Sequence, residues 1–169
     1  TGPAKPPGRP AGFSIGAQTA VTAMEDAEIA QADSVGYHTQ TVEPLTGYTV
    51  LRARREFNNQ SSLGFMTTAT NRQFDPATGF LADNAYAGGL DYDWRLSPMY
   101  SISGYVAGSH ITGNTVAIQR LQENNVHTFQ RPDADYLGVD PNATQLQGHA
   151  GSVSFGKIAG ESTRFSTYV

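Results

Sequence analysis

Five charged side chains recur at every second position of two segments of the chain. They are Arg52 and Arg54 in one segment and Asp91, Asp93 and Arg95 in the other. In an extended chain alternate residues point to the same side, so each set is expected to gather on one face. Such a face could bind or filter charged solutes. It could also be a ladder of cross-strand ion pairs that satisfies a narrow interior, which is the interpretation we favour.

A second group of polar side chains lies in a turn-rich segment further along the chain. Its members are Arg131, Asp133, Asp135, Asp140 and Asn142. Carboxylate and amide oxygens are ligands for calcium, so the group is a candidate calcium or ligand contact. The spacing lacks the bidentate Glu of an EF-hand loop, however, and acidic loops are commonly solvated turns. Arg131 beside these acids is expected to hold the loop in place.

The sequence contains no recognisable catalytic or metal-binding signature. The four histidines, His38, His110, His127 and His149, are scattered without H-E-x-x-H spacing, and there is no cysteine. His149 lies close to Ser152, which raises the idea of a serine hydrolase. No G-x-S-x-G motif is present, and the offset of the two residues places them on opposite faces of a strand. We therefore expect no enzyme activity, no metal ion and no cofactor.

Aromatic side chains accompany the charged ones at alternate positions. Tyr86, Tyr92, Trp94 and Tyr100 would form an aromatic girdle if the chain crosses a membrane as strands. In a water-soluble fold the same rings would belong to the core. A sugar-binding platform is a third interpretation, although these residues alternate along strands and do not cluster in one loop.

The element that positions most of these residues is a hairpin in the middle of the chain. From Tyr86 to Leu96 the even positions are apolar or glycine, while the odd positions carry Asp91, Asp93 and Arg95. A period of two predicts a long β-strand. A Ser97-Pro98 turn follows, and then a second alternating strand. A soluble protein buries the apolar face of such a hairpin, whereas a membrane barrel turns it to lipid and the ionic face to its lumen.

The same pattern predicts an antiparallel up-and-down meander of about seven long strands. These strands are residues 13–24, 48–57, 62–72, 86–96, 99–109, 145–158 and 162–169. Residues 1–12 are an irregular Pro- and Gly-rich lead-in. Residues 25–46 are expected to be a long loop, and residues 111–144 a longer one containing a short helix at 115–125. Tight turns then alternate with long loops, as in outer-membrane barrels with periplasmic turns and extracellular loops.

Composition agrees with an all-β chain and excludes several other classes. The 169 residues include 18 Gly and 9 Pro, which suits many turns. The net charge of -4 and the lack of a basic run argue against nucleic acid as a partner. No segment approaches the roughly 18 consecutive apolar residues of a membrane helix. Because the chain begins at Thr1 and its last strand ends without a turn, we expect it to be an internal piece of a longer protein.

Several stretches of the chain resemble a known family. They are VEPLTGYTVLRARREF (residues 42–57), the segment that ends in Thr70-Asn71-Arg72, AYAGGLDYDWRL (85–96), YSISGYVAGSHITG (100–113) and FQRPDADY (129–136). Together they resemble the large, functionally uncharacterised bacterial outer-membrane β-barrel domain that usually follows a family-9-like carbohydrate-binding module. The resemblance covers most of residues 13–169 and implies part of a transmembrane barrel. The chain has no such module, so carbohydrate binding is not carried over.

The sequence therefore predicts that residues 13–169 are a segment of a Gram-negative outer-membrane β-barrel. Its role would be structural or related to solute passage, with a polar, ionic lumen and residues 111–144 as an extracellular lid or binding loop. Its expected partners are outer-membrane lipid and the remaining strands of the parent barrel. The alternative is a soluble antiparallel β module that binds saccharide or protein and buries the same apolar face against a second sheet.

Overall fold

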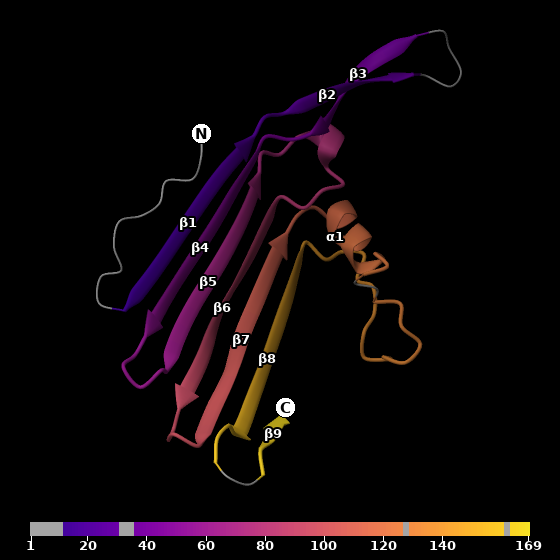
Figure 1. The fold of residues 1–169 in the computed structure, drawn as a ribbon. Helices are drawn as coiled ribbons and strands as arrows, with labels where there is room; N and C mark the ends of the chain where they lie inside the picture. Colours follow the sequence, from indigo (N-terminus) through magenta and orange to yellow (C-terminus); the bar gives the residue numbers. More distant parts are fainter. Residues whose placement is uncertain (1–11, 31–35, 127–128, 161–162) are drawn as a thin grey trace.

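The computed structural model describes residues 12–30, 36–126, 129–160 and 163–169. Seven strands form one antiparallel sheet in the order β1-β4-β5-β6-β7-β8-β9 (Figure 1). The strands are β1 (Phe13–Thr22), β4 (Thr46–Glu56), β5 (Ser62–Arg72), β6 (Asn84–Arg95), β7 (Tyr100–Thr112), β8 (Gln145–Lys157) and β9 (Phe165–Tyr168). The predicted seven-strand meander is confirmed. Within the described residues the sheet has β1 and β9 at its edges and does not close on itself.

The segment predicted as a loop at residues 25–46 is instead largely a second hairpin. Strands β2 (Glu25–Ala30) and β3 (Tyr37–Glu43) pair with each other beyond the end of the β1–β4 pair (Figure 1). The prediction was wrong because β2 has only six residues, and the alternation of Ala27 and Ile29 with acidic residues is too short to give a clear signal. Pro44 lies between β3 and β4, where its missing N–H interrupts the ladder.

Tight turns lie at one end of the sheet, as predicted. In the β4–β5 turn the left-handed residue is Gln60, with φ 63°. In the β6–β7 turn the hydroxyl of Ser97 accepts hydrogen bonds from the backbone N–H groups of Met99 and Tyr100, both at 3.2 Å. These short turns fix the register of the strands that they join.

The long connections meet at the opposite end of the sheet. The 3₁₀ turn η1 (Pro76–Thr78) lies between β5 and β6, and helix α1 (Thr115–Gln122) lies between β7 and β8, inside the interval where a helix was predicted. The Asn114 side chain caps α1 and also donates to the carbonyl of Gly79 at 2.6 Å. The two connections are therefore joined to each other.

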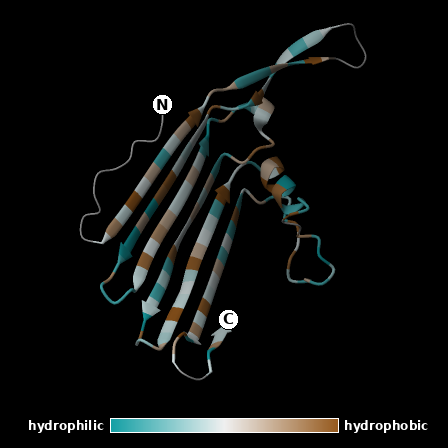
Figure 2. Cartoon of the chain, viewed as in Figure 1, coloured by the Kyte–Doolittle hydropathy of each residue, from teal (hydrophilic) through white to brown (hydrophobic). Residues whose placement is uncertain are grey.

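The buried apolar side chains of the described residues lie in these connections and not on the sheet. They are Ala117, Ile118 and Ala134. Along the strands apolar and polar residues alternate, as the banding in Figure 2 shows. No described element covers the apolar face of the sheet, where Ile15 is 67% exposed and Val106 59% exposed. The sheet is a single layer.

The predicted lead-in at residues 1–12 lies outside the described residues except for Gly12, and so does His127.

Candidate functional site

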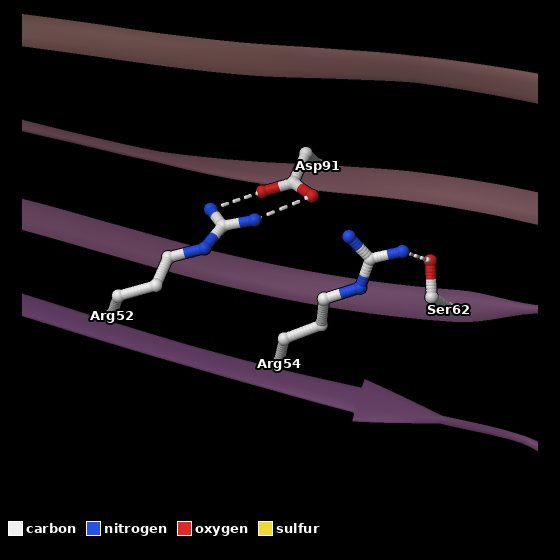
Figure 3. Close-up of polar contacts among 4 residues, drawn as sticks. All are labelled: Arg52, Arg54, Ser62 and Asp91. Atoms are coloured by element: carbon white, nitrogen blue, oxygen red, sulfur yellow. Dashed lines mark hydrogen bonds and ion pairs between the residues drawn. The ribbon is translucent and has the colours of Figure 1, made fainter. Parts of the chain in front are cut away.

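The strand register brings the predicted charged residues to one face of the sheet, which we call the polar face. Arg54 on β4 lies opposite Gly64 on β5, and Gly64 lies opposite Asp91 on β6. Arg52 is two residues from Arg54 and reaches diagonally across β5 to Asp91 (Figure 3). All five predicted side chains, including Asp93 and Arg95, share this face because they occupy alternate positions of β4 and β6.

Arg52 and Asp91 form a bidentate ion pair across the middle strand. Both terminal nitrogens of the guanidinium donate to the carboxylate, Nη2 to Oδ2 at 2.9 Å and Nη1 to Oδ1. This fork geometry fixes the orientation of both groups. Arg54 donates instead to the hydroxyl of Ser62 at 3.0 Å (Figure 3). The pair holds its charges neutralised on the polar face.

Gly64 provides the space for this ion pair. A β-carbon at this position would lie 2.5 Å from Asp91 Oδ1 and 2.6 Å from Arg52 Nη2. Any other residue type at position 64 would therefore push the two charged groups apart. Sequence reasoning did not single out Gly64, because its role depends on strands that come together only in the sheet.

Of the predicted ladder of ion pairs, the described strands contain one pair, Arg52–Asp91. Within the described residues neither Asp93 nor Arg95 joins an ion pair. The backbone N–H of Arg95 donates to the hydroxyl of the buried Ser61 at 2.9 Å, which ties the β4–β5 turn to β6. The polar face thus combines one neutralised pair with Asp93, which is exposed, and Arg95, which is half-buried.

A shallow depression of about 280 Å³ lies beside the ion pair. Small residues on β6 and β7, such as Ala87, Gly89 and Ala107, form its floor, and Arg52 and Asp91 line it. The depression exists because these small side chains sit among larger ones. It could admit a small solute group next to a fixed guanidinium and carboxylate.

The acidic residues of the long connection are the candidate calcium ligands of the sequence. Within the described residues no group of three or more His, Cys, Asp or Glu side chains is placed to hold a metal ion. Asp133 pairs with Arg131 at 2.6 Å, and Asp140 accepts from the backbone N–H of Asn142 at 2.9 Å. The hydrogen bonds from Arg131 lower the pKa of Asp133. Asp133 and Asp140 thus make local contacts in the described structure, and the calcium site stays a prediction.

The long connection also lies against the polar face at the end of β7 and β8. A cavity of about 560 Å³ is lined by Leu121, Phe129 and Leu137 of the connection and by Ile111 and Leu146 of the strands. In the strand register Ile111 and Leu146 are direct partners on the same face as Asp91. The connection and the polar face therefore line one cavity at this end of the sheet.

A buried glutamine holds this connection in shape. The Oε1 atom of Gln122 accepts from the backbone N–H of Asp140 at 2.8 Å, and its Nε2 atom donates to the carbonyl of Asp140 at 3.0 Å. The guanidinium of Arg120 lies 5.0 Å from the ring centroid of Phe80, which joins α1 to the β5–β6 connection. We call residues 113–144 together with residues 73–83 the cap.

The predicted aromatic residues lie on the face opposite the ion pair, which we call the apolar face. Trp94 packs on Phe57 with ring centroids 5.2 Å apart. Tyr100 stacks on Phe155 at 5.9 Å. These contacts lie near the short turns, whereas Tyr86 lies towards the cap, where its hydroxyl contacts the Asn71 amide at 2.6 Å. The face therefore carries aromatic rings at both ends.

Arg55 is a charged residue of the apolar face that sequence reasoning missed. It lies opposite Phe13 and Leu63 in the register. Its guanidinium is 5.0 Å from the ring centroid of Phe13 and 4.9 Å from that of Phe57. The strict alternation of β4 could have identified it, but the run of charges from Arg52 to Glu56 hides that alternation.

The family comparison agrees with the extent of this sheet. The family model described as "Domain of unknown function (DUF5916)" matches residues 4–167. The chain belongs to this DUF5916 family. No curated protein and no solved structure matches the chain. The described part of the chain also has no helix of the length and apolarity needed to span a membrane.

Proposed function

We propose that this DUF5916 chain is a wall segment of a β-barrel in a Gram-negative outer membrane, with a structural or solute-passage role. Its apolar face would contact lipid, and its polar face would line the lumen. The remaining strands of the parent barrel would complete the wall at β1 and β9. The resemblance of its strand motifs to an outer-membrane barrel domain supports this proposal.

The observation that carries the proposal is the exposed apolar face of a single-layer sheet. Leu90, at 47%, and Val106, at 59%, are examples of large apolar side chains that no described element covers. Burying one such side chain stabilises a protein by about 1.5–3 kcal/mol. In water a face of this kind is an aggregation hazard. Contact with lipid would remove the hazard along the whole face at once.

The dimensions of the strands fit a bilayer. Strands β4 to β8 have 11 to 13 residues, while crossing a bilayer as a tilted strand takes about 9–11. At roughly 3.4 Å per residue, Tyr86 and Trp94 are about 27 Å apart along β6. A strand tilt of about 40° reduces this to about 21 Å across the membrane, close to an apolar band of about 25 Å. Aromatic rings at both ends of that band would lie at the two interfaces.

The polar face and the cap suggest how a lumen would be used. The Arg52–Asp91 pair would place fixed charges in the path of a solute, together with Arg54, Asp93 and Arg95. The cap leans over this face at the end that carries the long connections. It would act as a lid or constriction, whereas no catalytic role is proposed for any residue.

Reconstitution of the full-length protein tests the proposal. Circular dichroism and urea resistance should report a folded β-sheet in phosphatidylcholine vesicles and none without lipid or detergent. A soluble monomer that melts cooperatively in plain buffer would contradict the proposal and favour a soluble binding module.

A second assay separates solute passage from a purely structural role. Vesicles containing the protein should swell in solutions of small polar solutes, and replacing residues 115–143 with a short Gly-Ser linker should increase the rate. An intact, inserted protein whose vesicles swell no faster than empty ones would leave only the structural role.

A further inference from the structure

The apolar face carries Arg and Lys side chains only next to the short turns, as judged from the strands that the structure describes. Arg55 is the penultimate residue of β4, and Lys157 is the last residue of β8. Both strands run towards the short-turn end. The strand register places no Asp or Glu of the seven strands on this face. The face is therefore positively charged at one end.

These two cations stand among aromatic rings. The guanidinium of Arg55 lies over both Phe13 and Phe57, and Phe57 in turn packs on Trp94. Lys157 is the direct cross-strand partner of Tyr100 on one side and Phe165 on the other. The ring of Phe155 links Tyr100 and Phe165, with centroids 5.9 Å and 6.2 Å away. Arg55 thus contacts one aromatic cluster, and Lys157 lies beside a second one in the strand register.

The chemistry of such an arrangement matches the boundary of a membrane leaflet. Aromatic rings prefer the level between acyl chains and headgroups, and long cationic side chains extend from apolar surroundings to the same level. The anion found there is the phosphodiester of a phospholipid. A guanidinium can donate two parallel hydrogen bonds to one phosphate. The rings hold Arg55 by cation–π contact, while its side chain remains exposed to such a group.

We propose that Arg55 binds phospholipid headgroup phosphates in the leaflet on the short-turn side. This inference rests on the proposed membrane function and adds the chemical identity of the lipid contact. Arg55, between Phe13 and Phe57, is the principal contact. The ionic groups of the polar face take no part in it.

The test compares two kinds of vesicle that differ in their headgroups. The full-length protein is refolded into vesicles of phosphatidylglycerol and into vesicles of digalactosyldiacylglycerol, a bilayer lipid without phosphate. Urea unfolding is followed by circular dichroism of the β-sheet. In phosphatidylglycerol we expect Arg55→Ala to lower the folding equilibrium constant roughly tenfold, as for the loss of one charge-assisted hydrogen bond. In the galactolipid the loss should be much smaller, and Arg55→Lys should restore part of the phosphate-dependent stability.

Arg54→Ala is the matched control, because Arg54 is the adjacent residue of the same strand on the opposite face. Its effect should be the same in both lipids. If Arg55→Ala is also equally costly in both lipids, Arg55 acts only by packing on its rings, and the inference is overturned while membrane insertion stands. A protein that inserts into neither vesicle overturns this inference and the proposed function together.

Discussion

The cap buries its central apolar side chains, whereas the sheet leaves the side chains of its apolar face exposed. In the cap, Ile118 is 0% exposed, and Gln122 is 1% exposed with its amide bonded to Asp140. On the sheet, Val106 and Leu90 are about half exposed, and nothing described covers them. The cap has a small core of its own. No described element shields the apolar face of the sheet, and this difference is the basis of the membrane proposal.

The largest expected effect comes from opening a cavity in the cap. Ile118→Ala removes a fully buried side chain and should destabilise the cap by about 2–5 kcal/mol. Hydrogen exchange should then accelerate in residues 113–144 and stay unchanged in β6 and β7. Val116→Ala on the same helix, where the side chain is 62% exposed, should have little effect. Equal loss of protection in the strands would show that cap and sheet are one cooperative unit.

An arginine introduced on the apolar face of the sheet should cost more stability than one introduced on the polar face. Val106 and Ala107 are neighbours on β7, both exposed, and they point to opposite faces. In lipid vesicles Val106→Arg should lower the free energy of unfolding by about 2–4 kcal/mol, the cost of an Arg at the membrane midplane. Ala107→Arg should cost much less. Urea titration in vesicles measures both, and equal costs would contradict lipid contact at Val106.

A smaller effect is expected at the ion pair of the polar face. Gly64→Ala should cost about 1 kcal/mol or less, because it disrupts a partly exposed pair, and measured exposed pairs are worth that much. The cost should fall in an Asp91→Ala background, where the clashing carboxylate is gone. Gly16→Ala is the control, since an added β-carbon there meets nothing within 4 Å. An undiminished cost in the Asp91→Ala background would show that Gly64 serves another purpose.

The smallest effect concerns the exposed Arg131–Asp133 pair of the cap. Hydrogen bonds from Arg131 lower the pKa of Asp133, so the contact favours the folded cap above the ordinary carboxyl range. That contribution should be lost as pH falls through the lowered pKa. Carboxyl NMR titration should show that Arg131→Ala raises the pKa of Asp133 towards its ordinary value, while a backbone hydrogen bond still lowers it. An unchanged pKa in this variant would assign the shift to the backbone of the loop.

Sequence periodicity predicts the sheet because a period of two determines which face each strand residue occupies. It placed Asp91 and Arg52 on polar faces, but their pairing depends on how β4, β5 and β6 align, and that register comes from the turns. The role of Gly64 follows only from this three-strand alignment. The β2–β3 hairpin was not predicted because its apolar alternation is limited to Ala27 and Ile29 and gives only a weak periodic signal. The acidic loop residues lie in irregular chain, where spacing does not determine which side chains converge.

The central claim is that the two faces of β6 contact different environments, and a cysteine scan tests it most directly. The chain has no native cysteine, so a cysteine placed in turn at each of residues 86–94 adds the first thiol to this segment of the protein, which is then reconstituted in lipid vesicles. A membrane-impermeant maleimide should label the odd positions, and a lipid-dissolved spin-label quencher should reach probes at the even ones. This alternation is the result that the account predicts. Equal labelling of odd and even positions by the maleimide would contradict it.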